Sequence, residues 1–472
     1  MVGFGIRKTK IDVKYKLYIA MNILILGAGQ VGSTTAKQLA KEEDNEITIV
    51  DINPDKLSKL SNTTDLRVVE GNASYPNILK AAGADTADML VALTSSDEVN
   101  MIACQIASTL FNTQTKIARI RASEYSDNQD LFSETEIPVD YYINPEELIT
   151  NYIAELIQHP GAFQVLDFAE GRMRMVGVRT KQQGFLVGNP ISALHQHLGN
   201  EKVRIAAIYR DGDIINIDGS TVIQEKDEVY FIAAPEDIDD LIIEFSQDHE
   251  RVRSVVIAGG GKIGLKLAAR LERNNHVKLI EKSIARAKEL AEQLDTTIVL
   301  KGDAADDVLL TEENINNTDV FVAVTNSEEA NLLSSMVAKK LGTKKVFALI
   351  NKTSYSGLAE AETIDVSFSA EEITISSLLS HVRKGDVVKV HTLKRGNAEA
   401  LEAIAHDHEN SKVVGKPIEE IILPSGSYIT AVVSSQGEIR AVHHTTVIQP
   451  DDHVIVFISN REAVAEIETL FE

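Results

Sequence analysis

The chain has 472 residues, a length that predicts about two to four domains. Apolar residues make up 44% of it and charged residues 25%, which excludes a disordered chain and a fibrous one. Acidic residues outnumber basic ones, 70 against 47, and the net charge of -23 argues against nucleic acid or an anionic membrane as a direct partner. The one cysteine, Cys104, cannot form an internal disulfide, and no apolar run reaches the roughly 18 residues that a membrane helix needs. We therefore expect a cytoplasmic protein.

Residues 1–20 differ from the rest of the chain, because they are basic and carry only one acid, Asp12. They lack the continuous apolar stretch of about 7 to 15 residues that a secretory signal requires. An apolar strand pattern begins directly after Met21. We expect Met21 to be the natural start and residues 1–20 to be a basic extension, upstream of that start or disordered. A basic arm that contacts a partner is the alternative.

Two halves of the chain repeat one another. Gly27 and Gly259 both follow an apolar strand pattern and stand 232 positions apart, and Asn100 and Asn331 stand 231 apart. Later in each half, residues 221–224 (Thr-Val-Ile-Gln) recur unchanged as residues 446–449. The chain is therefore a tandem duplication of a unit of about 230 residues.

The first part of each repeat alternates short apolar strands with helical patterns, for example at residues 34–41 and 100–110. The expected strands lie at 22–26, 46–50, 66–69, 88–94, 116–121 and 140–143, and again at 254–258, 277–280, 297–300, 319–325, 345–350 and 365–369. Such alternation predicts an α/β fold with a doubly wound parallel sheet of the Rossmann type.

The second part of each repeat, about 163–246 and 386–472, has short β-rich runs separated by polar turns, which predicts small α+β modules. The sequence thus predicts two Rossmann-like doubly wound parallel-sheet domains, each followed by a small α+β domain. The expected boundaries are 21–145, 160–246, 252–372 and 384–472.

A glycine-rich loop follows the first strand of the first repeat. It consists of Gly27, Ala28, Gly29, Gln30, Val31 and Gly32. Glycines at this spacing permit a tight turn, the approach of a pyrophosphate and close packing of the next helix. Asp51 ends the second strand, where an acid accepts hydrogen bonds from ribose hydroxyls. No Lys or Arg follows directly in 52–54, so NAD(H) is favoured over NADP, and the ribose of ATP or ADP fits equally. An empty, vestigial loop is the alternative.

Other positions at the carboxyl edge of the same sheet fit this pocket. Asn72 and Ala73 follow the third strand and are candidates to face the adenine. Thr94 and Ser95 follow the fourth strand and are candidates to contact phosphate or ribose. Arg119, near the end of the fifth strand, could pair with a phosphate, and a surface or interface arginine is the equal alternative.

The second repeat keeps the loop and the acid. Its candidate residues are Gly259, Gly260, Gly261, Lys262, Ile263, Gly264, Glu281, Asp303 and Thr325. The constant offset of 231 places Ile350 at the position of Arg119, which removes one candidate phosphate partner. Lys262 replaces Gln30 and could compensate. Nucleotide binding and a vestigial site both remain open for this repeat.

A reaction centre is harder to find. No histidine falls at matched positions of both repeats near a sheet edge, although hydride transfer requires a general acid or base. His406 with His408, and His443 with His444, could suggest a metal, but exposed or interface histidines are the simpler interpretation. Cys104 fits a buried helix position. The acid pairs 97–98 and 328–329 most simply favour a helix N-terminus. We expect a protein that is not an enzyme, with an NAD-dependent oxidoreductase as the alternative.

Four features together carry a resemblance to a known family: the loop 27–32, Asp51, the run Gly-Asn-Ala-Ser at 71–74 and the run Leu-Thr-Ser-Ser-Asp-Glu-Val-Asn at 93–100. With the domain order, they make residues 21–472 resemble the TrkA family. Its members are the peripheral NAD-binding regulatory subunits of bacterial Trk potassium-uptake systems, and they are built from tandem RCK domains. A regulator of another cation channel or antiporter is the alternative within the RCK domains.

The resemblance implies a homotetrameric ring on the cytoplasmic face of the inner membrane, docked on a TrkH- or TrkG-type potassium-translocating protein. NAD(H), ATP or ADP would bind the Rossmann domains and gate potassium permeation, and no nucleic acid is involved. The small α+β modules match the RCK C-terminal domains, whose ligand stays open. Carried over by position, the nucleotide-binding residues are 27–31, Asp51, Asn72, Thr94, Ser95 and Arg119, then 259–263, Glu281 and Thr325.

Overall fold

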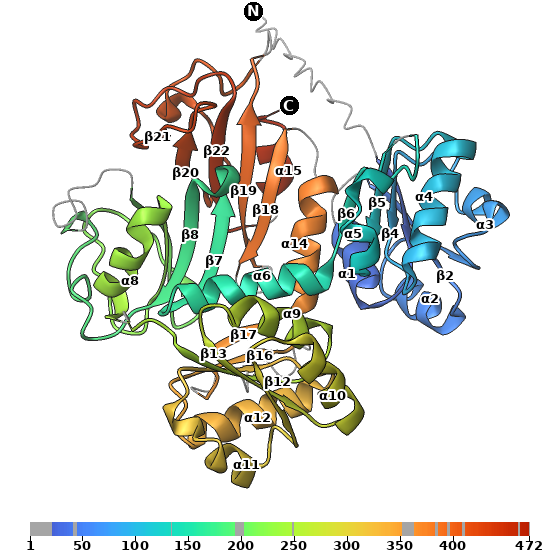
Figure 1. Cartoon of the computed structure of the whole chain (residues 1–472). Coiled ribbons are helices and arrows are strands. Elements are labelled where there is room, and N and C mark those ends of the chain that lie inside the picture. Colours follow the sequence, from blue (N-terminus) through green and yellow to red (C-terminus); the bar gives the residue numbers. More distant parts are fainter. Residues whose placement is uncertain are drawn as a thin grey trace, which may run out of the picture. The chain divides into compact units, whose positions relative to one another are not determined.

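A computed structural model describes most of the chain in two compact units, Met1–Tyr142 and Ile143–Glu472 (Figure 1). The basic extension 1–20 lies outside the described residues. No helix among the described residues is long and apolar enough to cross a membrane. The described ranges are 21–40, 45–133, 135–193, 203–247, 250–351, 363–382, 386–393, 397–407, 411–460 and 463–471.

The first unit contains a six-stranded sheet in the order β3-β2-β1-β4-β5-β6. Successive strands are added to one side of β1 up to β3, and from β4 onward to its other side, so the strand order reverses between β1 and β4. The pairs that join β1 to β5 in this order, and β2 to β3, are parallel. Its strands are β1 (Asn22–Leu26), β2 (Glu46–Asp51), β3 (Arg67–Glu70), β4 (Met89–Ala92), β5 (Thr115–Arg119) and β6 (Tyr141–Ile143). Its helices are α1 (Gln30–Leu39), α2 (Pro54–Ser61), α3 (Pro76–Ala81), α4 (Asp97–Phe111) and α5 (Ser123–Ser126).

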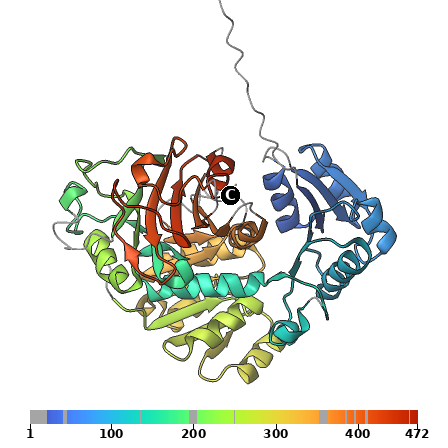
Figure 2. The same ribbon diagram turned by 90° about the horizontal axis from the view of Figure 1, so that it is seen from above.

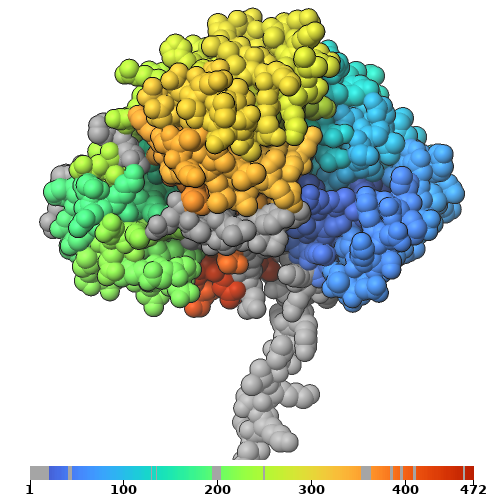
Figure 3. All heavy atoms as spheres, turned by 90° about the horizontal axis from the view of Figure 1, so that it is seen from below, coloured from blue at the N-terminus to red at the C-terminus, as the bar shows by residue number. Residues whose placement is uncertain are grey.

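A second six-stranded sheet repeats that order as β14-β13-β12-β15-β16-β17, again with parallel pairs. Its surface fills the part of Figure 3 coloured yellow to orange. Its strands are β12 (Ser254–Ala258), β13 (His276–Glu281), β14 (Ile298–Lys301), β15 (Val320–Ala323), β16 (Lys345–Leu349) and β17 (Val366–Phe368). The helices between them are α9 (Lys262–Leu271), α10 (Ile284–Gln293), α11 (Asp307–Glu312) and α12 (Glu328–Lys340).

The predicted fold class is confirmed, and the element ends differ for physical reasons. The strand expected at 88–94 ends at Ala92, because Asn100 holds the backbone N–H of Thr94 and turns the chain out of the sheet. The helix expected from residue 34 begins at Gln30, since its first turn is the glycine loop itself, whose composition hides a helical pattern. The helix expected from residue 100 begins at Asp97, capped by Ser96.

Two antiparallel five-stranded sheets form the small modules, in the orders β10-β9-β11-β8-β7 and β18-β19-β22-β20-β21. The first has β7 (Ala162–Phe168), β8 (Met173–Arg179), β9 (Arg204–Arg210), β10 (Asp213–Ile214), β11 (Glu228–Ala233) and α8 (Ile238–Ser246). The second has β18 (Val387–Leu393), β19 (Ala398–Ala405), β20 (Ser427–Val433), β21 (Ile439–Arg440), β22 (Asp452–Ile458) and α15 (Val464–Glu468).

The two antiparallel sheets share one core, which the sequence did not predict. Figures 1 and 2 both show them side by side. Phe168 and Met175 of the first sheet lie in the same buried cluster as Leu393 and Ile455 of the second. The Ala169 N–H also donates across the interface to the Glu402 carboxylate, at 2.8 Å. Each module therefore buries one apolar face against its own repeat copy.

Helix α6 (Pro145–Gln158) connects the first parallel sheet to the first antiparallel sheet, and α14 (Ala370–Val382) has the same place in the second repeat. Asn144 caps α6 by accepting from the Glu147 N–H, and Pro145 stands at the first helical position, a strong start signal. In Figure 1, α6 lies between the antiparallel sheets and α9, and it contacts both α9 and α14.

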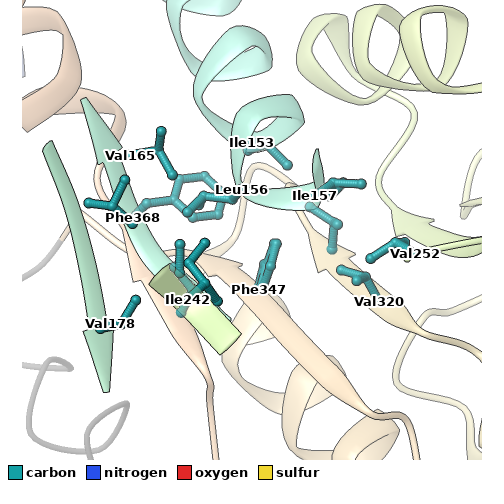
Figure 4. Close-up of a cluster of buried hydrophobic side chains, with 14 of the residues drawn as sticks. Ile153, Leu156, Ile157, Val165, Val178, Ile242, Val252, Val320, Phe347 and Phe368 are labelled. Atoms are coloured by element: carbon teal, nitrogen blue, oxygen red, sulfur yellow. The ribbon is translucent and has the colours of Figure 1, made fainter. Parts of the chain in front are cut away.

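The apolar face of α6 joins the second parallel sheet to the first small module. Ile153, Leu156 and Ile157 are buried in one cluster with residues from both, as Figure 4 shows. The partners labelled there include Val165 and Val178 of the small module, and Val320, Phe347 and Phe368 of the parallel sheet. The second unit thus has a continuous core that runs through α6.

Ile153 tests how much this helix contributes to stability. It is 0% exposed, so Ile153→Ala leaves a cavity and lowers the free energy of unfolding by about 2–5 kcal/mol. Ile284→Ala is the matched control, because Ile284 is 63% exposed and its removal changes stability by about 0.5 kcal/mol or less. Urea unfolding of both variants measures the difference. Equal effects would contradict the central place of α6 in the core.

Candidate functional site

The first glycine loop lies at the edge where the sheet order reverses, the usual ligand position of such folds. Gly27 has a φ of +105°, and a β-carbon there would meet the backbone of Leu93 and Thr94. A β-carbon on Gly32 would overlap the carbonyl oxygen of Gly27. Both positions therefore require glycine for the backbone alone, and they bring the end of β1 against the turn after β4.

Gly29 is different, because a β-carbon there would have no atom within 4 Å. It is the N-cap of α1, makes no side-chain capping bond, and no acid stands in the first turn that Gln30 begins. The N–H groups of such a first turn have no partner within the helix, and they carry the positive end of the helix dipole. An anionic group fits above Gly29 for both reasons.

The second loop repeats this arrangement at the start of α9. Gly259 has a φ of +111°, Gly264 lies against the Gly259 carbonyl, and Gly261 faces open space. Lys262 opens the helix where Gln30 opens α1, and its side chain is exposed. A lysine beside the open position adds attraction for an anion.

The acid that ends the second strand is bonded to the glycine loop in both repeats. One oxygen of Asp51 accepts from the Ala28 N–H at 2.6 Å, and the other from the Asn53 N–H at 2.8 Å. Glu281 does the same with the N–H groups of Gly260, at 2.9 Å, and Ser283, at 2.7 Å. A carboxylate has about four acceptor positions, so each can still accept from two ribose hydroxyls.

Sequence reasoning missed a basic residue in each repeat, which lies near the acid in the first repeat and contacts the glycine loop in the second. The Lys56 ammonium lies 3.8 Å from the Asp51 carboxylate. The Arg286 guanidinium donates to the Gly260 carbonyl oxygen at 2.9 Å. Both lie in the first turn of the helix that follows the second strand. Sequence reasoning had considered only residues 52–54, directly after Asp51.

A buried asparagine fixes the turn after the fourth strand. Asn100 is 0% exposed, and its carbonyl oxygen accepts from the Thr94 N–H at 3.0 Å and the Thr94 hydroxyl at 2.6 Å. Its amide donates to the Arg119 carbonyl oxygen at 2.9 Å, which joins the ends of β4 and β5. The identical Thr-to-Asn spacing in both repeats was the signal that could have revealed this role.

The second repeat has the same lock. Asn331 accepts from the N–H and hydroxyl of Thr325 at 2.8 and 2.6 Å, and donates to the Leu349 carbonyl oxygen at 3.0 Å. Leu349, and not Ile350, therefore corresponds to Arg119. The strand register agrees, since Met89 pairs with Thr115 as Val320 pairs with Lys345. The constant offset failed because the helix before β16 is shorter than its counterpart α4.

Two guanidinium groups flank the first site. Arg119 donates to the Thr94 carbonyl oxygen and Arg121 to the Ser95 carbonyl oxygen. Arg121 also lies 3.7 Å from Asp97, whose buried carboxylate accepts from the N–H groups of Arg121 and Ala122. Asp97 is thus a structural residue at the start of α4. Sequence reasoning missed Arg121, whose place is taken by Asn351 in the second repeat.

The residues after the third strand fit the edge only in part. Asn72 accepts from the N–H and the hydroxyl of Ser74, at 2.9 and 2.8 Å, while the Ala73 side chain packs in the core. In the second repeat Asp303 accepts from the Ala305 N–H and pairs with Lys282 at 3.0 Å. These two bonds lower the pKa of Asp303.

The other candidates for chemistry are occupied elsewhere. Cys104 is buried in α4, and this burial raises the pKa of its thiol to about 12, which confirms a core position. His406 pairs with Asp451 at 2.9 Å, and His408 lies outside the described residues. Over the described ranges, no group of three or more His, Cys, Asp or Glu side chains could hold a metal ion.

The structure therefore brings most sequence-predicted residues together at two equivalent edges. The first edge combines the loop 27–32, Asp51, Thr94, Ser95 and Arg119. The second combines the loop 259–264, Glu281 and Thr325, with Asp303 bonded to Lys282 beside them. The edges differ chiefly after the fifth strand, where the first has Arg119 and Arg121 and the second has Leu349 and Asn351.

Comparison with known families matches both repeats. The TrkA-N domain family matches residues 23–145 and 255–370, and the TrkA-C domain family matches residues 184–245 and 407–472. Curated relatives match nearly the whole chain. The "Trk system potassium uptake protein TrkA" of Vibrio alginolyticus is 50% identical over 96% of this chain and 99% of its own length. The proteins of the same name from Halomonas elongata and Haemophilus influenzae are 48% and 45% identical over the same share of this chain.

Solved structures share the fold at low identity. The "Crystal Structure of the GsuK RCK domain" has a TM-score of 0.60 at 17% identity and covers 96% of this chain and 95% of that chain. The structure named "GsuK channel bound to NAD" has the same TM-score and identity, and covers 96% of this chain and 79% of that one.

The second and third glycines of the first loop, Gly29 and Gly32, lead to opposite predictions for stability. Gly32→Ala forces a β-carbon onto the Gly27 carbonyl, so the midpoint of thermal unfolding falls, with a cost of about 1–3 kcal/mol. Gly29→Ala meets open space at a backbone angle that alanine tolerates, φ -73°, so the same midpoint changes little. Calorimetry of both variants measures this, and equal destabilisation would contradict the open position at Gly29.

Proposed function

This chain belongs to the TrkA family, and from that premise we propose that it is the nucleotide-binding regulatory subunit of a Trk-type potassium-uptake system. NAD(H) is the proposed ligand of the glycine loops, with ATP and ADP as alternatives at the same sites. The observation that carries the proposal is the first loop. There an open, uncapped helix start at Gly29 lies beside the Asp51 carboxylate and two guanidinium groups.

Each group at the first loop would bind a different part of such a ligand. The backbone N–H groups at the start of α1 would hold the pyrophosphate, for which Gly29 leaves room. Asp51 would accept from the adenosine ribose hydroxyls while it stays bonded to the Ala28 N–H. Arg119 and Arg121, held at the turn after β4, would attract the phosphate charges. Asn72, which follows the third strand, would face the adenine.

The carboxylate also supports NAD(H) over its phosphorylated relative. A phosphate on the ribose would be brought against the Asp51 carboxylate, which stays bonded to the Ala28 N–H of the loop and to the Asn53 N–H. Lys56, at 3.8 Å, neutralises part of this charge but does not replace the acid. ATP and ADP have the same free ribose hydroxyls, so this feature does not discriminate among the three nucleotides.

The two loops are proposed to differ in the charge they accept. The first offers Arg119 and Arg121. The second offers Lys262 at its helix start and Arg286 at its loop, but Leu349 and Asn351 at the arginine positions. We therefore assign the first repeat as the principal nucleotide site. The second would hold a nucleotide through Glu281 and the start of α9 with fewer charge contacts.

A regulatory role requires binding and no reaction. A ligand shifts an equilibrium between two states of an assembly when it binds them with different affinity. The relatives are named as potassium-uptake proteins, and one solved structure with this fold is named as a channel bound to NAD. We propose that this chain acts as a homotetramer docked on a TrkH- or TrkG-type membrane protein, at the cytoplasmic face of the inner membrane.

Titration with NADH, NAD and ATP tests the nucleotide site. We expect wild-type binding with a dissociation constant on the order of micromolar, and Asp51→Asn to weaken it about tenfold or more, because the charge that accepts from the ribose is lost. Asp51→Asn keeps an oxygen for the Ala28 N–H but loses the acceptor of the Asn53 N–H, so thermal unfolding, measured alongside, separates lost affinity from a lost fold. Asp55→Asn, which changes an exposed acid in the first turn of α2, is the matched control and leaves affinity unchanged.

Three outcomes decide among the interpretations. Weakening by Glu281→Gln shows that the second loop is also occupied. Cofactor turnover with a substrate would favour the oxidoreductase alternative over a regulator. An absence of binding to all three nucleotides would overturn the proposal and leave both loops as scaffold.

A further inference from the structure

A cavity of about 520 Å³ lies in the second unit, away from the glycine loops. It is lined by the carboxyl end of α6, by α8, by the segment that leads into β12, and by the carboxyl end of α9 with the turn after it. Its volume falls within the roughly 300–1,000 Å³ of small-molecule sites. Neither the nucleotide proposal nor the family matches assign it a ligand.

The floor of this cavity is apolar and rigid. Ile157 of α6, Ile242 of α8, Leu271 of α9 and Val252 before β12 line it, and each is 5% exposed or less. All four belong to the continuous core of the second unit, and Figure 4 shows Ile157, Ile242 and Val252 within that cluster. Because these side chains are fixed by the core, the floor is preformed for an apolar group.

The cavity lining has more basic than acidic side chains, whereas the chain as a whole is acidic. Two guanidinium groups, those of Arg251 and Arg270, line the cavity, and among its described lining residues only Asp239 has a carboxyl group. The chain as a whole has 70 acidic and 47 basic residues. A local excess of positive charge in so acidic a protein concentrates anions at this point.

The one carboxylate is already engaged. The His159 Nδ1 and an Asp239 oxygen are 2.8 Å apart, and Arg174 Nη1 lies 2.8 Å from the other ring nitrogen, Nε2. A guanidinium group can only donate, so Nε2 accepts and the ring proton is on Nδ1. His159 therefore donates to Asp239 and holds this carboxylate against the ring, which leaves the guanidinium groups of the wall to a ligand.

The two arginines are not equivalent. Arg270 is in the last turn of α9, where the helix dipole favours a cation, and it donates to Asn151 of α6. Arg251 precedes β12, outside any helix, and is exposed, so neither explanation applies to it. The amide groups of Gln158 and Asn274 add further donors beside them.

From this juxtaposition of apolar floor and paired guanidinium groups, we propose that the cavity binds a small organic anion. Its apolar body lies on the floor formed by Ile157, Ile242, Leu271 and Val252, and its acid group bonds to Arg251 and Arg270. The second glycine loop lies at the opposite end of α9, about 15 Å from this cavity along a helix of 10 residues. The proposal does not depend on nucleotide binding there.

Anilinonaphthalene sulfonate is the probe, because it joins apolar rings to one acid group and fluoresces when bound. At physiological salt we expect Arg251→Ala and Arg270→Ala each to weaken its binding about tenfold, the loss of one charge-assisted hydrogen bond. Phenylnaphthylamine, its neutral analogue, should bind wild type and variants alike. Arg273→Ala is the matched control, since Arg273 is exposed in the turn directly after α9 and does not line the cavity.

The proposal is overturned if the double variant of Arg251 and Arg270 binds the sulfonate as tightly as wild type. It is equally overturned if Arg273→Ala weakens binding as much, because attraction would then be a property of the surface. Thermal unfolding of each variant, measured alongside, separates a lost ligand contact from a lost fold.

Discussion

Contact between two backbone positions, Gly32 and the Gly27 carbonyl, is the constraint on which the first parallel-sheet domain depends. It sets α1 directly against β1, so that the helix starts at the point where the sheet order reverses. This helix start in turn produces the open position above Gly29, the bond between the loop and Asp51, and the closeness of the turn after β4. The second repeat meets the same constraint with Gly264 and Gly259. The site is thus a consequence of close packing, and its chemistry was added by the residues around it.

The repeats have kept the scaffold and changed the charges. Asn100 and Asn331 make the same bonds to Thr94 and Thr325, and both acids hold their loops. The scaffold therefore tolerates different side chains at the ends of β5 and β16, where arginine has been exchanged for leucine. A duplicated fold of this kind can present two sites of different charge without a change in architecture, which would suit the regulatory role proposed above.

Much of the fold and part of the site could be predicted from the sequence. Apolar runs and glycine spacing identified both parallel sheets, because these patterns follow directly from burial and backbone sterics. Arg121, Lys56 and Arg286 were missed, since their approach to the site depends on the turn after β5 and on helix geometry, not on adjacency in the chain. The place of Leu349 was misassigned, because a shorter helix shifts the register by one. The shared core of the small modules required knowledge of long-range packing that no local pattern carries.

In the second unit, packed elements connect the second glycine loop to the antiparallel sheet of the first repeat, so a ligand at the loop could change how they pack. Helix α9 begins at the second glycine loop and packs on α6, which in turn shares a core with the antiparallel sheet of the first repeat. The most direct test of the central claim is potassium flux into vesicles that contain a purified TrkH-type membrane subunit with this chain bound. The account predicts that NADH or ATP changes the flux with wild type, and that Asp51→Asn shifts this response to higher nucleotide concentration while the variant stays bound. A flux indifferent to nucleotide, or an identical response from Asp51→Asn, would contradict it.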